Sequence, residues 1–271
     1  MINFSTTISI RLIILVSGCL FLFCKKSNEA TIQPPYYPSS NDTTTYELIW
    51  SDEFDSTAIN TATWNFETGG SGWGNNEQEY YQAANAGIEN GNLVITARKE
   101  TVDSNNYTSA RMTTQRKKEF LYGRIEARIK IPVGQGLWPA FWMLGSDINT
   151  VPWPGCGETD IMEHINADSI IYGTAHWDNN GHRQDGGNVT SSPSDYHVYS
   201  VEWDAKLIKW FVDNVKYHET TIVDNSTSEF HQPFFIILNL AVGGNWPGQT
   251  IDNSLIPAKM YVDYVRVYQK K

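Results

Sequence analysis

The sequence predicts an all-β sandwich, because its apolar residues recur with the period of two that strands require. Apolar and charged side chains alternate through 125–131, and a similar alternation through 208–213 ends at a turn signal, Asp213-Asn214. The stretch 234–242 is continuously apolar apart from Asn239, which predicts a central strand buried on both faces. Neither a long amphipathic helix nor an internal repeat competes with this interpretation.

Three segments follow one another along the chain. Residues 1–24 carry a single charge, Arg11, before an apolar run that is too short to span a bilayer comfortably, as in a bacterial export signal. Residues 25–46 are rich in Pro, Ser, Thr and Asn, which predicts a flexible linker. Residues 47–271 are long enough for one well-buried domain.

The cysteines predict a lipid anchor rather than a disulfide. Val16-Ser17-Gly18-Cys19 resembles a lipoprotein processing box, and Cys24, just past the apolar run, is the competing acylation site. A plain secretory leader is the alternative. Beyond the leader only Cys156 remains, so the domain has no intramolecular disulfide, and Cys156 is expected to be a small loop residue. The expected location is therefore the cell envelope, on the outer membrane or cell surface, or outside the cell.

The charge balance narrows the choice of partners. A net charge of −10 argues against nucleic acid, whose phosphates would be repelled. A monomer is the default expectation for the oligomeric state.

The segment 157–163, GETDIME, carries the most chemical information in the chain. It places Glu158, Asp160 and Glu163 within six positions, after a turn rich in Pro and Gly. In a regular strand Glu158 and Asp160 share one face and Glu163 lies on the other. A β-bulge at Ile161-Met162 would turn all three carboxylates to the same face. Two nearby carboxylates with unequal pKa values are the equipment for cleaving a glycosidic bond.

A hairpin partner for this strand is predicted at 170–177, after the turn formers 166–169. If residues 165 and 170 close the hairpin, the bulge sets Tyr172 opposite Glu163, Thr174 opposite Asp160 and His176 opposite Glu158. His176 then becomes a candidate to contact the carboxylates.

Three other readings of the motif are open at this point. A helix would place Ile161, Met162 and Ile165 on one face, although the β-branched residues and the lack of a capping residue favour a strand. The acids could form a solvated surface, or they could supply oxygen ligands to a hard cation.

Tryptophan is abundant, with ten residues in the chain, and indole rings stack on the apolar faces of sugars. Two Gly-rich loops, 72–77 and 243–248, combine a tryptophan with amide groups and so predict sugar contacts. Trp138 and Trp142 are in phase on a strand and could line one cleft. Six tryptophans fall in contexts that look like loops: Trp73, Trp138, Trp142, Trp153, Trp177 and Trp246.

The sequence resembles glycoside hydrolase family 16, in particular its bacterial laminarinase-like endo-β-1,3-glucanases. The resemblance runs through most of the domain in ten ordered segments. They are LIWSDEFD, WGNNEQEYY, YTSARM, YGRIEARIKIP, GQGLWPAFWMLG, GETDIME, GTAHW, YSVEW, ILNLAVGGNWPG and MYVDYVRVYQ. Thr159 and Ala110 depart from the residues usual in the family, and neither change removes a catalytic group.

The resemblance implies a β-jelly-roll (concanavalin A-like) sandwich with a concave substrate cleft. It implies Glu158 as nucleophile, Glu163 as general acid/base and Asp160 between them, with no cofactor needed for catalysis. It implies a structural calcium held by Glu53, Gly91 and Asp263. The implied substrate-binding residues are Asn76, Glu77, Arg111, Trp138, Trp142, His176, Asn239 and Trp246.

The expected activity is endo-hydrolysis of β-1,3-glucans such as laminarin, with retention of anomeric configuration. Mixed-linkage β-1,3-1,4-glucanase activity is the nearest alternative among enzymes. A non-catalytic glucan-binding protein is the alternative from another class, and retention of both glutamates argues against it.

Overall fold

The computed structural model describes residues 45–223 and 225–271. The predicted leader, its two candidate cysteines and nearly all of the predicted linker lie outside these residues. The last linker position, Tyr46, is already the first residue of a strand, because Tyr46 pairs with Lys270 near the C-terminus. The first strand therefore includes the last residue of the predicted linker. No helix among the described residues is long and apolar enough to cross a membrane.

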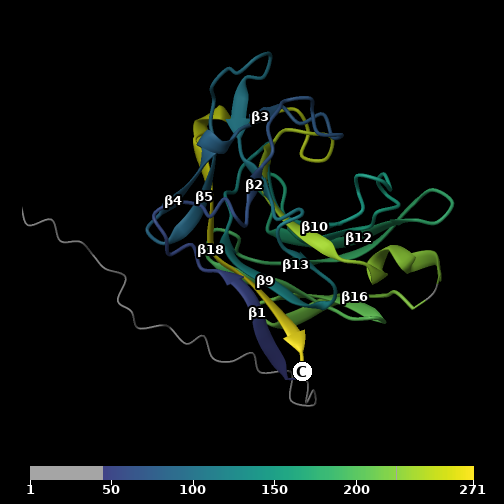
Figure 1. Ribbon diagram of the computed structural model, residues 1–271. Coiled ribbons are helices and arrows are strands. Elements are labelled where there is room, and N and C mark those ends of the chain that lie inside the picture. Colours follow the sequence, from purple (N-terminus) through teal and green to yellow (C-terminus); the bar gives the residue numbers. More distant parts are fainter. Residues whose placement is uncertain (1–44, 224) are drawn as a thin grey trace, which may run out of the picture. The chain divides into compact units, whose positions relative to one another are not determined.

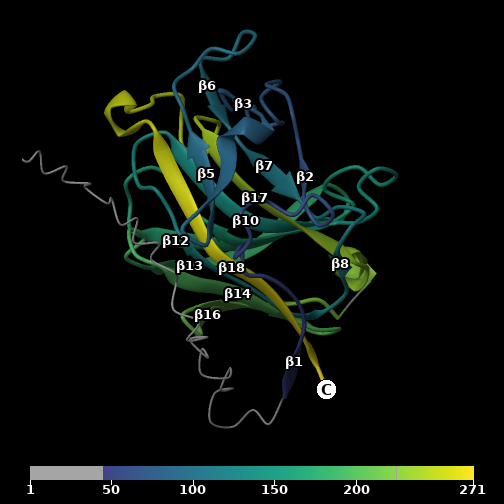
Figure 2. The same cartoon turned by 60° about the vertical axis from the view of Figure 1, so that its left-hand side comes forward.

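Within the described residues, two antiparallel eight-stranded sheets stack face to face (Figures 1 and 2). The first, called here the β18 sheet, contains β1 (Tyr46–Asp52), β4 (Ala86–Glu89), β5 (Asn92–Ala97), β9 (Gly123–Lys130), β14 (His197–Trp203), β15 (Leu207–Val212), β16 (Val215–Thr221) and β18 (Ala258–Lys270).

The second, called the β11 sheet, contains β2 (Asn65–Phe66), β7 (Arg111–Thr113), β8 (Glu119–Phe120), β10 (Leu137–Gly145), β11 (Glu158–Glu163), β12 (Ile170–Asp178), β13 (His182–Thr190) and β17 (Phe234–Val242). A short parallel pair joins β3 (Glu79–Tyr81) to β6 (Tyr107–Ser109).

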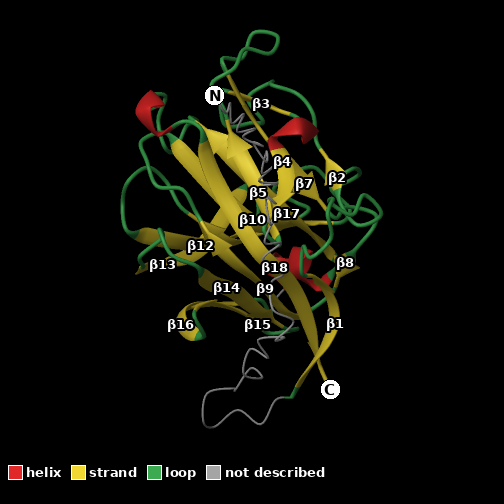
Figure 3. Cartoon of the chain, turned by 90° about the vertical axis from the view of Figure 1, so that its left-hand side faces the viewer, coloured by secondary structure: helices red, strands yellow, loops and turns green. Residues whose placement is uncertain are grey.

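Helical structure in the described chain is confined to three short 3-10 turns (Figure 3). These are η1 (Ala83–Asn85), η2 (Asn225–His231) and η3 (Asn253–Leu255). The expectation of an all-β sandwich without a long helix is confirmed.

The core between the sheets follows from the predicted periodicity. In β9 the alternating residues Ile125, Ala127 and Ile129 are fully buried and join one core cluster. Every residue of β17 is buried, and β17 lies between β10 and β7 in the middle of its sheet, as the unbroken apolar run predicted. Asp213 and Asn214 adopt positive φ angles between β15 and β16, which confirms the predicted turn.

Candidate active site

Strand β11 presents three carboxylates on one face because it contains a bulge. Its pairing with β12 shifts register between Asp160 and Glu163, so that Glu158, Asp160 and Glu163 face His176, Thr174 and Tyr172 respectively. The extra residue lies within Ile161-Met162, both of which are buried in the core. The predicted strand, bulge and cross-strand register are all confirmed.

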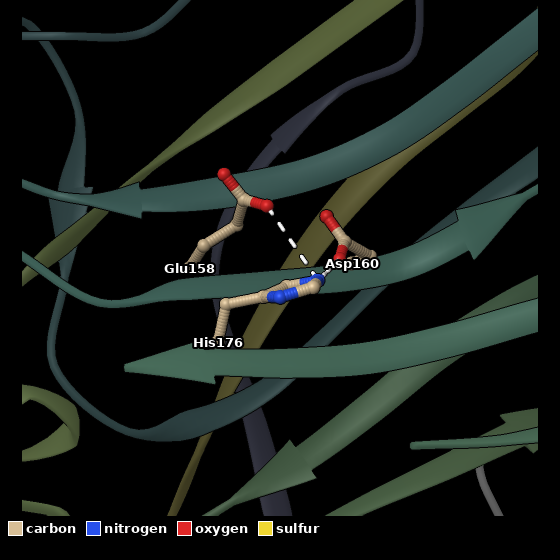
Figure 4. Close-up of side chains that lie close together, drawn as sticks. All are labelled: Glu158, Asp160 and His176. Atoms are coloured by element: carbon tan, nitrogen blue, oxygen red, sulfur yellow. Dashed lines mark ion pairs between the residues drawn. The ribbon is translucent and has the colours of Figure 1, made fainter. Parts of the chain in front are cut away.

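His176 approaches two of these carboxylates from β12 (Figure 4). Its Nε2 atom lies 3.1 Å from Asp160 Oδ2 and 3.8 Å from Glu158 Oε1. One donor atom from each of the three residues lies within 4.8 Å of the others, so this is a place in the described chain where a cation could be held. The contact to Asp160 is electrostatic, because Asp160 Oδ2 accepts no aligned hydrogen bond.

Glu163 is held by the neighbouring strand β10. The indole Nε1 of Trp138 donates a hydrogen bond of 2.9 Å to Glu163 Oε1. Trp138 and Trp142, four positions apart on β10, both line the same cavity, which confirms that they share a face. The Glu163 carboxylate is thus held by an indole that itself lines the cleft.

The carboxylates bind protons more tightly than ordinary acids. Burial raises the pKa of Asp160 to about 8. Burial, reinforced by the charge of Asp160, raises the pKa of Glu163 to about 8, although the Trp138 hydrogen bond opposes the shift. Burial and then Asp160 raise the pKa of Glu158, while His176 and Arg111 favour its charged form. Because all three carboxyl groups are buried side by side, the cluster keeps protons near neutral pH and titrates as a unit.

Two adjoining cavities meet at the carboxylates. One, of about 330 Å³, extends toward β7 and β17, and the other, of about 500 Å³, extends toward β12 and β13. Both are lined by Asn75, Trp138, Glu158, Asp160 and Glu163. The carboxylates thus lie midway along a cleft that has room on both sides.

The smaller cavity contains four of the predicted binding residues in one connected network. Arg111 lies between two indole rings, 5.0 Å from the Trp73 centroid and 4.8 Å from that of Trp142. Asn239 accepts a hydrogen bond of 2.7 Å from Trp142 Nε1 and donates one of 3.1 Å to Tyr81. The Tyr81 hydroxyl in turn donates to Glu77 at 2.9 Å. These contacts fix the positions of the polar groups and aromatic rings that line this cavity.

The larger cavity contains His176 and the exposed Trp246. The Trp246 ring makes edge contacts with Trp138 at 5.6 Å and Tyr172 at 4.9 Å, so one aromatic cluster spans loop 243–248, β10 and β12. Both Gly-rich loops that predicted sugar contacts therefore reach the cleft.

One predicted binding residue lies differently from the others. Asn76 does not line either cavity; its side chain donates to Asn245 at 2.8 Å and so braces the two Gly-rich loops against each other. Its neighbour Asn75 lines both cavities instead. The positive φ of Asn76 (54°) turns the backbone at this point, which sequence spacing alone does not reveal.

Several cleft residues were not predicted from the sequence. Trp153, expected only as a loop tryptophan, lies in the smaller cavity, while Trp177 packs against Phe230 and lines neither cavity. Strand β13 contributes a wall that no pattern predicted, because its sequence HRQDGGNVT is polar without alternation. The missed lining residues are Tyr172, Thr174, Gln184, Gly186, Gly187 and Asn188.

The expected calcium ligands lie away from the cleft, and their side chains are already paired with cations. The Asp263 carboxylate lies 2.9 Å from Arg128, and the Glu53 carboxylate forms two hydrogen bonds with Arg266. Ca²⁺ needs six to eight oxygen ligands and would compete with these guanidinium groups. The arrangement of Glu53, Gly91 and Asp263 therefore does not favour Ca²⁺. Calcium binding stays a prediction.

Comparison with known proteins identifies the family of the domain. A sequence model described as Glycosyl hydrolases family 16 matches residues 73–266. The chain belongs to glycosyl hydrolase family 16. Its two antiparallel sheets form the jelly-roll sandwich expected from the resemblance.

Individual relatives of this family 16 protein cover the same domain. The chain is 41% identical over 244 residues to the Beta-glucanase of Rhodothermus marinus, a match covering 83% of the chain and 85% of the relative. It is 46% identical over 231 residues to the Clotting factor G alpha subunit of Tachypleus tridentatus, covering 83% of the chain but only 34% of that relative. The X-ray structure of the laminarinase from Rhodothermus marinus matches with a TM-score of 0.79 at 40% identity, covering 85% of the chain and 100% of the laminarinase.

Proposed function

We propose that this family 16 protein is a retaining endo-β-1,3-glucanase. The observation that carries the proposal is the bulge in β11, which turns Glu158 and Glu163 into one cleft and holds Asp160 between them. The relatives named beta-glucanase and laminarinase support a β-glucan as the substrate class. Cavities on both sides of the carboxylates support cleavage within a chain rather than at its end.

The two glutamates have different roles in the proposed mechanism. Glu163, protonated because of its raised pKa, gives its proton to the glycosidic oxygen as the bond to the anomeric carbon breaks. Glu158 attacks the anomeric carbon and forms a glycosyl–enzyme ester. Water, deprotonated by Glu163, then cleaves the ester and restores both groups, so the β configuration is retained. Retention requires the two carboxyl groups to be about 5–5.5 Å apart.

The neighbouring groups set these protonation states. Asp160 repels a second negative charge and so favours the protonated form of Glu163. His176 and Arg111 favour the charged form of Glu158. The indoles of Trp138, Trp142 and Trp246 would stack on glucose rings on either side of the reacting bond.

Proton NMR of laminarin during digestion tests the proposal. Early appearance of the β-anomer, before mutarotation, is the expected result for the retaining pair. Early α-anomer would contradict the assignment of Glu158 as nucleophile. Binding of laminarin without cleavage would favour a glucan-binding protein, and faster cleavage of a mixed-linkage β-1,3-1,4-glucan would favour the alternative enzyme.

The position in the cell is a separate part of the proposal. The N-terminal sequence supports export and acylation at Cys19 or Cys24, which would tether the domain to the cell envelope. Metabolic labelling with a palmitate analogue should label the chain, and replacement of the acylated cysteine by serine should abolish the label. A chain that is released unlabelled would instead be a secreted protein. The domain is proposed to act as a monomer, which light scattering would test.

A further inference from the structure

We propose that His182 is a positioning residue that fixes the tautomer of His176 beside the catalytic carboxylates. His182 is the first residue of β13, and its Nε2 atom lies 2.8 Å from His176 Nδ1. The two rings are nearly parallel, with an interplanar angle of 21° and centroids 5.1 Å apart. The inference has two halves. The catalytic half, an effect of His182 on turnover, rests on the proposed function, whereas the tautomer half, its effect on the His176 proton, does not.

The backbone places His182 where it can reach this nitrogen. Register pairs Asp178 with His182 and His176 with Gln184, so His182 is the diagonal neighbour of His176. The connecting turn is closed by a hydrogen bond from Gly181 N to Asp178 Oδ1 at 3.1 Å. Trp153 covers the ring of His182 from the facing loop, with centroids 4.7 Å apart. An exposed side chain is thereby held in one orientation.

Hydrogen-bonding rules then restrict the protons of the pair. Two ring nitrogens can form a hydrogen bond only when one carries the proton and the other has a free lone pair. If His176 Nδ1 carried the proton of a neutral ring, its Nε2 lone pair would face Asp160 Oδ2 at 3.1 Å and Glu158 Oε1 at 3.8 Å. That arrangement is repulsive when either carboxylate is ionised.

The favourable arrangement reverses the direction of the hydrogen bond. His182 Nε2–H donates to His176 Nδ1, and the proton of His176 then resides on Nε2, facing Glu158 and Asp160. If His176 takes up a second proton, His182 can switch tautomer and accept from Nδ1–H. His182 therefore preserves the hydrogen bond in both protonation states, which no carbonyl oxygen could do because it only accepts.

The other groups around the two histidines make different contacts. Gln184 lines the cavity beside His176, and Trp153 contacts both histidines through its ring. Burial lowers the pKa of His182, and His176 and then Arg183 lower it further. His182 thus stays neutral and able to donate at neutral pH.

Two substitutions separate hydrogen bonding from packing. His182→Phe retains an aromatic ring against Trp153 but removes the hydrogen bond, whereas His182→Gln retains both a donor and an acceptor. We expect long-range ¹H–¹⁵N spectra to show the Nε2–H form of His176 in the wild type and in H182Q, and a mixture with the Nδ1–H form in H182F. His197→Phe is the matched control, because His197 pairs with Asp213 outside both cavities.

Activity on laminarin provides the second readout. Because one hydrogen bond is lost, kcat should fall roughly threefold to tenfold in H182F, with KM changed by less than about twofold, and H182Q should recover most of the loss. An unchanged His176 tautomer in H182F would overturn the inference. A changed tautomer with unchanged kcat would overturn its catalytic half, and a wild type inactive on β-glucans would refute the proposed function while leaving the tautomer result standing.

Discussion

The indole Nε1 of Trp210, in the β18 sheet, donates a hydrogen bond of 2.8 Å to the backbone carbonyl of Asp160 in the β11 sheet. Asp160 stands directly before the bulge, where the register of the β11–β12 pairing shifts. Gly173 allows the approach, because a Cβ atom there would lie 2.3 Å from Trp210 Cδ1. The bulge that turns Glu163 into the cleft is therefore anchored from the opposite sheet.

Replacing Trp210 with Phe should weaken this anchor. The variant retains the aromatic packing but removes the indole donor of this buried hydrogen bond, which costs about 0.5–1.5 kcal/mol. We expect chemical denaturation to show this loss and kcat to fall as Glu163 becomes less well placed. Trp203→Phe is a matched control, because Trp203 also donates a buried hydrogen bond to a carbonyl, that of Phe230, away from the bulge. Equal kcat losses in the two variants would contradict a special role for Trp210.

Replacing each of the two glutamates proposed as catalytic with glutamine should give different kinetic signatures. Glu163→Gln loses proton donation, and we expect a loss of roughly 10²–10⁴-fold on laminarin. The loss should be smaller for the glycosylation step with an aryl glucoside, whose leaving group needs no proton. Glu158→Gln should be inactive on both substrates. Glu219→Gln is the control, because Glu219 is exposed on β16. Near-normal activity of E158Q would refute the assignment of Glu158 as nucleophile.

The alkaline limb of the pH–activity profile should respond to Trp138. Glu163 must be protonated to act as acid, so activity should fall as the pH rises through its pKa of about 8. The Trp138 hydrogen bond lowers the pKa of Glu163, so Trp138→Phe should raise that pKa and move the alkaline limb to higher pH. Trp246→Phe, which changes the same aromatic cluster without touching Glu163, should raise KM and leave the limb in place.

Much of the site could be predicted from the sequence because its chemistry is local. The three carboxylates lie on one strand, and the need to share a face predicted both the bulge and the register with His176. The contribution of β13 could not be predicted, since its polar sequence gives no period and His182 reaches the site only through the turn at Gly181.

The burial of a charged residue on β9 could not be predicted from the alternation of apolar residues either. The alternation 125–131 predicted which residues form the core, yet Arg124, on the other face, is fully buried as well. Arg124 forms ion pairs with Glu126 on its own strand and Glu202 on β14, 78 residues away. The order of the strands in the sheet brings these two residues together. The periodicity of apolar residues does not specify that order.

The thiol of Cys156 should be inert in the folded protein. It is fully buried in the loop before β11, and burial together with the charge of Glu158 raises its pKa to about 12. We expect no reaction with a thiol reagent at pH 8 until the protein is denatured, because the thiolate is the reactive form. Rapid labelling of the native protein, with both leader cysteines replaced by serine, would show that this loop opens.

The buried acids should make the fold less stable at alkaline pH. The pKa of Glu163 is about 8 in the folded protein but close to 4.5 when the chain is unfolded. The folded state therefore binds the proton more tightly. The stability contributed by this group is fully present below about pH 4.5 and is lost as the pH rises through about 8.

Glu163→Gln removes this titration while leaving a side chain of similar size. Its Tm should be close to that of the wild type at pH 5 and higher at pH 9, by at least about 2–4 °C, the shift that 1 kcal/mol produces in a domain of this size. Glu219→Gln, whose carboxylate lies at the surface beside Lys216, should not show a rising advantage with pH. A constant difference in Tm between E163Q and the wild type from pH 5 to 9 would mean that Glu163 is not held protonated. Another group would then have to donate the proton in the mechanism.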